Sequence, residues 1–219
     1  MRSPDKLHHT VETIEWTEDA NPELMMWNYP LDDREIRYGA KLLVREFQQC
    51  IFFDRDKILS VFQPGIYTLT GDNMPGILNS ARLDVKEEFR PHIYFWKTKF
   101  FIDQKWCAPD LIQPDEINSG GVKLKVFGTC DLKITDVVTC IRHVGHMNDG
   151  LTTREINDQV GKLIQHLFPI KIKEQKLLVM EETNQQNEIV EAIQQAVNTE
   201  LKRAGVSISK LTIKISEKN

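Results

Sequence analysis

The sequence has few of the features that mark a membrane span, a zinc site or a secreted protein. Its longest apolar runs are about four residues, as at 93–96 and 177–180, whereas a transmembrane helix needs about 20. None of the four cysteines belongs to a C-x-x-C pair, and the polar N-terminus has no signal peptide. We therefore expect a chain that does not span a bilayer by itself, with reduced, mostly buried cysteines, as in a cytoplasmic protein.

The sequence also lacks an excess of positive charge. Its 219 residues include 28 Lys and Arg against 32 Asp and Glu, which gives a formal net charge of −4. Nucleic-acid-binding domains usually carry a basic patch, and anionic membrane surfaces attract polybasic segments. The overall charge therefore favours neither a nucleic acid nor an anionic membrane surface as the partner.

Residues with catalytic chemistry do not form a recognisable arrangement. No Ser-His-Asp or Cys-His spacing is visible. Asp54 and Asp56 lie at a predicted hairpin tip, where Asp side chains form hydrogen bonds with the backbone of the turn. His143 and His146 form a close histidine pair, with Cys140 near enough to be a third metal ligand. Glycine and Asn-Asp-Gly around this pair indicate a loop. We expect no enzyme activity, no cofactor and no metal, with a metal-dependent module at 140–146 as an alternative.

What the sequence does contain is β-strand pattern, most clearly in residues 41–75. Two β-rich runs, 42–53 and 58–62, flank a short polar break and predict a hairpin. Pro64-Gly65 predicts a second turn, after which Tyr67 and Leu69 share one face of a third short strand. This stretch reads as a structural β-meander.

A second strand pattern covers residues 122–134. Apolar residues alternate with lysines and other polar residues, so one face is expected to be buried and the other wet. Gly128 interrupts the order and predicts a bulge or a close backbone approach. Residues 93–96 also predict a strand, 100–102 continue this β region, and 109–121 predict a loop.

Two helices and a strand are expected near the C-terminus. The first helix covers 152–167, with Thr152 and Glu155 as a capping box, and Pro169 ends it. The second covers 183–204, with Gly205 as its C-terminal cap. A terminal strand follows at 211–215. One apolar stripe runs along the second helix, either packed on the sheet or exposed as a seam for a partner helix: Ile189, Ile193, Val197 and Leu201.

An ordered series of short motifs runs through residues 16–75. Its members are Trp16, Tyr29-Pro30, Ile36, Gly39, Leu42, Val44, Gln48, Phe52-Phe53, Lys57, Phe62, Pro64-Gly65, Tyr67, Leu69, Asn73 and Pro75. Lys105-Trp106, Gly128, Leu132-Lys133-Ile134 and Asp136 continue it. The series resembles the SPFH superfamily, also called Band 7 (stomatin, prohibitin, flotillin), and within it a bacterial branch labelled virion-core-protein-like.

The resemblance implies a fold and a domain division. We expect an α+β fold: a flexible lead at 1–12, a β-rich SPFH-like subdomain at 13–140, and a smaller α/β subdomain at 141–219 with a long C-terminal helix and a final strand. Together these form one SPFH-like domain.

The resemblance also implies a function. We expect a non-enzymatic scaffold that forms homo-oligomers and organises or supports membranes or membrane-associated complexes. It would be cytoplasmic, with a peripheral position at a membrane or on a membrane protein left open. Exposed residues for contact with a membrane or partner are predicted to be Met26, Trp27, Phe100 and Phe101. The alternative is a monomeric protein-binding adaptor with the same fold.

Overall fold

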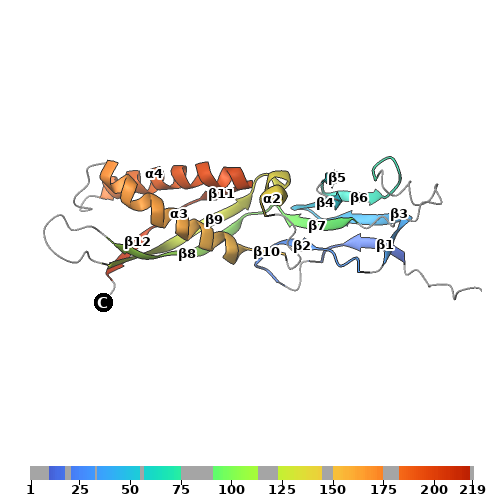
Figure 1. Ribbon diagram of the computed structural model, residues 1–219, viewed down its shortest axis with the longest axis horizontal. Coiled ribbons are helices and arrows are strands. Elements are labelled where there is room, and N and C mark those ends of the chain that lie inside the picture. The colour runs from blue at the N-terminus through green and yellow to red at the C-terminus, as the bar shows by residue number, and fades with distance from the viewer. Residues whose placement is uncertain are drawn as a thin grey trace, which may run out of the picture. The chain divides into compact units, whose positions relative to one another are not determined.

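The computed structural model describes residues 10–17, 21–32, 34–54, 57–74, 91–112, 123–144, 150–174 and 183–217. It shows the predicted α+β fold, with strands dominating the first half and helices the second (Figure 1). The chain packs as two compact units. Unit 1 contains residues 1–98 and 147–151, and unit 2 contains 99–146 and 152–219.

Unit 1 is built from two β-sheets. The three-stranded sheet has, in spatial order, β1 (Thr10–Glu15), β3 (Glu35–Val44) and β6 (Gly65–Thr68). The five-stranded sheet has the order β10 (Leu151–Thr152), β2 (Leu24–Asn28), β7 (His92–Lys97), β4 (Gln48–Asp54) and β5 (Lys57–Phe62). β1 runs parallel to β3, and β6 runs antiparallel to it.

The core of unit 1 joins these two sheets. Ile14 and Leu42 from the first sheet belong to one buried cluster with Phe52 and Phe95 from the second. Trp16 is buried in it and stacks on Trp27 with ring centroids 5.9 Å apart. Trp16 is therefore a core residue of unit 1.

The predicted hairpin is present, but the β-meander is wrong in its third strand. β4 and β5 pair antiparallel, whereas β6 leaves them and pairs with β3, placing Tyr67 opposite Leu42. The apolar run 42–53 is also interrupted, because Phe47 has a left-handed φ of 61° at the turn between β3 and β4. Periodicity alone does not reveal such a turn, since no glycine marks it.

Unit 2 has one sheet with helices on one side (Figure 1). β9 (Lys123–Ile134) is central, β8 (Phe101–Ile112) lies along one edge of it, and β11 (Val206–Ser209) and β12 (Lys214–Glu217) share the other edge, all antiparallel. The helices are α2 (Val137–Val144), α3 (Thr153–Glu174), α4 (Thr183–Leu201) and the short 3-10 helix η2 (Lys202–Ala204). α3 packs on β8, and α4 packs on α3 and β11.

β9 has the predicted alternation. Its even-numbered residues Val126, Cys130 and Leu132 are buried, whereas Lys125 is exposed. The close backbone approach at Gly128 is also confirmed, because a Cβ atom there would collide with the carbonyl of Thr212. The Thr212 N–H donates a hydrogen bond to the Thr129 carbonyl at 2.8 Å, which fixes this crossing.

Two prolines do not end the elements that contain them. Pro109 lies inside β8, where a loop was predicted, next to a shift in the β8–β9 register between Ala108 and Leu111. An edge strand tolerates a missing N–H at such an irregularity. Pro169 lies inside α3, which continues to Glu174 instead of stopping before it. Helix packing on the sheet outweighs the local cost of this proline.

The predicted helix caps are confirmed. The Thr152 N–H donates to Glu155 Oε2 at 2.8 Å, and the Glu155 N–H donates to Thr152 Oγ1 at 3.4 Å, which completes the capping box. Gly205 has a left-handed φ of 69° after η2. The terminal strand lies three residues later than expected, at β12, and β11 was missed.

The two compact units do not follow the predicted subdomain borders. Residue 140 lies inside α2, and β8, β9 and α2 belong to unit 2 together with the C-terminal helices. At the N-terminus, β1 begins at Thr10, within the segment expected to be a flexible lead. Residues 1–9 lie outside the described residues.

Candidate interaction surfaces

The four predicted contact residues do not form one surface. Met26 is fully buried and Phe101 is 6% exposed, so the structure corrects the prediction for these two: they are core side chains of sheet strands. Trp27 is half-buried against Trp16. Phe100 alone is well exposed, at 53%, with the Lys133 ammonium 4.7 Å from its ring centroid.

The apolar stripe of α4 is covered within unit 2. Ile189, Ile193, Val197 and Leu201 are all at most 5% exposed. Because α4 packs on α3 and β11, the stripe is the inner face of a helix on a sheet. The structure therefore rejects the partner-helix seam and supports the other interpretation.

The described residues of the alternative metal site lie on a helix and not in a loop. Cys140 and His143 lie on α2, and His146 lies outside the described residues. The Cys140 thiol is buried, and this burial together with the Asp136 carboxylate raises its pKa to about 12. In the described part of the chain, no three His, Cys, Asp or Glu side chains gather closely enough to hold a metal ion.

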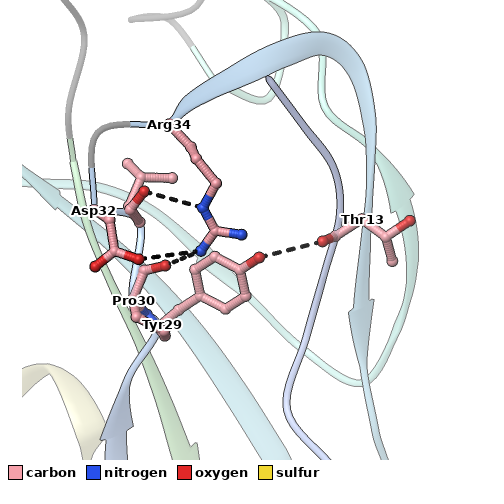
Figure 2. A network of polar contacts seen from close by, with 6 residues as sticks. Thr13, Tyr29, Pro30, Asp32 and Arg34 are labelled. Carbon is pink, nitrogen blue, oxygen red and sulfur yellow. Dashed lines mark hydrogen bonds and ion pairs between the residues drawn. The ribbon is translucent and has the colours of Figure 1, made fainter. Parts of the chain in front are cut away.

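Figure 2 shows a polar network at the connection between β2 and β3. Arg34 Nε donates to the Leu31 carbonyl at 3.3 Å, and its guanidinium lies 5.7 Å from the Tyr29 ring centroid and 3.7 Å from the Asp32 carboxylate. The Tyr29 hydroxyl donates to the Thr13 carbonyl at 3.4 Å. Exposed ion pairs contribute little stability. This network therefore mainly holds the β2–β3 connection in place, and the Tyr29 hydroxyl links it to β1.

Other motif residues also hold backbone in place. The buried Gln48 amide donates to the Trp16 carbonyl at 3.3 Å. Asn73 accepts a hydrogen bond from the Thr70 N–H and donates to the Thr68 carbonyl, each at 2.9 Å. The ordered motifs that carried the resemblance thus describe a fold and its turns rather than a reaction centre.

Sequence reasoning missed a buried carboxylate on the polar side of β9. Asp131 is 4% exposed, accepts the Asp103 N–H at 2.9 Å, and pairs with the Lys210 ammonium at 2.9 Å. The Asp103 hydrogen bond is the main reason why the pKa of Asp131 is lowered, and Lys210 adds to it. Strand parity placed Asp131 on the wet face, but a bulge in β8 and the positive φ of Asp103 and Lys210 bring partners over it.

Unit 1 presents strand edges. β6 and β5 are the last strands of their two sheets, so one side of each is unpaired among the described strands. Ile66 on β6 is 75% exposed, the largest exposed fraction among the described large apolar side chains. It lies opposite the half-buried Leu43 of β3.

The fold described above has a β-rich unit and a second unit in which helices flank a sheet. The model of the SPFH domain-Band 7 family matches residues 26–218, and the chain belongs to that family. Members of this family are in general membrane-associated, non-enzymatic scaffolds. Among the described helices, none combines the length and the hydropathy that crossing a membrane requires.

A curated bacterial protein is similar to this chain. It is the "Uncharacterized protein YdjI" of Bacillus subtilis (strain 168), which is 23% identical over 159 residues, covering 71% of this chain. The matched region spans 48% of that relative, so this chain matches about half of its length. The match is consistent with the bacterial branch that the motifs resemble.

Proposed function

We propose that this protein is a non-enzymatic scaffold that self-associates and organises or supports membranes or membrane-associated complexes. Its position would be cytoplasmic and peripheral to the membrane. Membership of the SPFH domain-Band 7 family supports the class of function. The observation that carries self-association is the exposed edge strand β6.

An edge strand offers unpaired N–H and C=O groups to a further strand, and proteins usually protect such edges with charge, proline or a covering element. β6 has the sequence Gly-Ile-Tyr-Thr and no charged residue. Ile66 and Leu43 form an apolar cross-strand pair beside this edge. A second copy that adds a strand here would extend the sheet and cover Ile66.

In this proposal the edge of β6, and not the long helix α4, is the element that joins two copies of the chain. The apolar stripe of α4 is already buried in unit 2, so its side chains are not available for contact with a second copy. Assembly through β6 leaves unit 2 intact and leaves its surfaces available for other contacts.

The test is the molar mass of the full chain by light scattering across a concentration series, for the wild type and for Ile66→Lys. We expect wild-type masses that are multiples of one chain. A lysine at the edge should weaken association at least about tenfold, because an assembled edge would bury its charge. Gln195→Lys, at an exposed position of α4, is the matched control and should assemble like the wild type.

A wild-type protein that stays strictly monomeric at high concentration would overturn self-association. The monomeric adaptor would then be favoured, and a pull-down should return one stoichiometric partner without a second copy of this chain. Equal assembly of the wild type and Ile66→Lys would show that the interface is not at β6, while the proposed scaffold function would stand.

A further inference from the structure

One face of the unit 2 sheet is rich in lysine. α3 and α4 cover the side that carries Val126, Leu132 and Trp106. On the other side, Asp131 is the one described β9 residue that is buried, through its contacts with Asp103 and Lys210. We call this other side the open face. Its described cations are Lys105, Lys125, Lys133 and Lys214.

Strand register places these four side chains together. Lys105 lies opposite Thr129, and Lys214 lies opposite Phe127, so both share the odd-numbered side of β9. Lys125 and Lys133 are on that same side, because β9 itself has no bulge in these pairings. The two are eight residues apart, or about 27 Å along an extended strand.

The acids near this face do not cancel the lysines. Asp131 is paired at 2.9 Å with a fifth cation, Lys210. Exposed Asp103 lies beside that pair, and its N–H donates to Asp131. Within the part of the chain that the structure describes, no ion pair joins a carboxylate to Lys105, Lys125, Lys133 or Lys214, although the whole chain has a net charge of −4.

Aromatic rings lie between the lysines. The Lys125 ammonium is 5.8 Å from the Phe127 ring centroid, and the Lys133 ammonium is 4.7 Å from that of Phe100. Phe127 is half-buried and Phe100 is 53% exposed. A cationic surface with apolar stems and rings suits the boundary between lipid headgroups and acyl chains.

We propose that the open face docks on the anionic phospholipid surface of a membrane, with the four lysines against the headgroups. This inference rests on the proposed function and names the surface that would serve its membrane contact. The net charge of the chain did not favour an anionic membrane surface as partner. The local attraction, however, depends on where the lysines lie and not on the sum of all charges.

A lipid surface fits this face better than a nucleic acid does. The four cations are lysines, which act as mobile point charges, whereas planar recognition of bases and phosphates favours the fork of arginine. Single-stranded nucleic acids also stack bases on open aromatic rings. Here the ring faces of Phe100 and Phe127 already carry ammonium groups.

The test is co-sedimentation of the full chain with vesicles of 30% phosphatidylglycerol and 70% phosphatidylcholine, and with pure phosphatidylcholine. The wild type should bind the anionic vesicles and release them as NaCl rises from about 0.05 to 0.5 M, because salt screens the attraction. Changing all four lysines to Gln should reduce partitioning by about fivefold per lysine, or about 600-fold in total.

Two variants separate this effect from misfolding or a change in total charge. Changing the same four lysines to Arg keeps the charge and should keep binding. The matched control is Arg154→Gln, Lys162→Gln, Lys202→Gln and Arg203→Gln together, which removes four exposed cations from the helical side and should bind like the wild type. Circular dichroism spectra check that each variant folds.

The outcomes distinguish this inference from the proposed function. Equal binding of the wild type and the four-Gln variant, or an equal loss in the helical-side control, would overturn the open face as the docking surface while leaving the scaffold. Lysine-dependent binding of a fluorescent single-stranded oligonucleotide without vesicle binding would overturn the lipid assignment. Self-association is measured without vesicles, so its failure is seen separately.

Discussion

Strands β7 and β9 show how differently the two units use a sheet. In β7 five consecutive residues, Ile93 to Lys97, are buried, so side chains on both faces of that strand are covered. In β9 burial alternates from Val126 to Ile134, apart from Asp131. The first pattern leaves only His92 of β7 exposed, whereas the second leaves most side chains on one face of β9 at least partly exposed.

This difference assigns the two units different tasks. Unit 1 presents its backbone edges, chiefly β6, because its sheet faces are largely used in the core. Unit 2 presents side chains, because its helices cover only one face. Under the two proposals, assembly uses the β6 edge of unit 1 and membrane docking uses the open face of unit 2.

The largest effect on stability is expected when one phenylalanine ring is removed from each unit and the two losses of unfolding free energy are compared. Phe95→Ala removes a fully buried ring from unit 1 and should cost about 3–5 kcal/mol of unfolding free energy. Phe127→Ala removes a half-buried ring from the open face and should cost about 1 kcal/mol or less. Chemical denaturation followed by circular dichroism measures both. Similar costs would mean that the open face is part of a core.

An intermediate effect is expected where α3 meets β8. Gly161→Ala improves helix propensity by about 1 kcal/mol, but its Cβ would collide with the Cys107 carbonyl. Overpacking costs about 1–3 kcal/mol, so we expect a net loss of about 1–2 kcal/mol in unfolding free energy. Gln159→Ala, exposed on the same helix, should change stability by less than about 0.5 kcal/mol. A stabilised Gly161→Ala variant would show that the helix is not pressed against the sheet.

The smallest effect concerns Asp131 and pH. Because hydrogen bonding from Asp103 and pairing with Lys210 lower its pKa below the ordinary 3.8, the ionised carboxylate stabilises the folded state above that pH. This contribution is lost as pH falls through the lowered pKa. At pH 7, Asp131→Asn should cost about 1 kcal/mol, and the difference from the wild type should shrink between about pH 5 and pH 2. Denaturation series at several pH values measure it, and a constant difference would contradict the pairing.

The sequence was most informative where one local rule decides the structure. Period-two alternation predicted β9, the Thr152–Glu155 box predicted the start of α3, and Gly205 predicted the end of the last helical segment. Ordered motifs predicted the family, because they encode turns and buried contacts such as Gln48 on Trp16. The strand and the helix ends depend on neighbours close in sequence or on a repeated pattern, whereas the family was predicted from the order of the motifs along the chain.

Features set by tertiary packing were not visible. The exchange of β6 to the other sheet depends on pairing with β3, and the left-handed turn at Phe47 has no glycine to mark it. The burial of Met26 and Phe101 likewise depends on which sheet face is covered. The lysine face was hidden by the net charge, although strand parity already placed its members of β9 on one side.

Lysine-reactive labelling of the full chain bound to anionic vesicles tests most directly whether unit 2 meets the membrane through its open face. Mass spectrometry would compare each lysine with and without vesicles. Lys105, Lys125, Lys133 and Lys214 should be protected, while Lys162 and Lys202 on the helical side stay labelled. Protection of the helical lysines, with the four open-face lysines still labelled, would contradict this orientation.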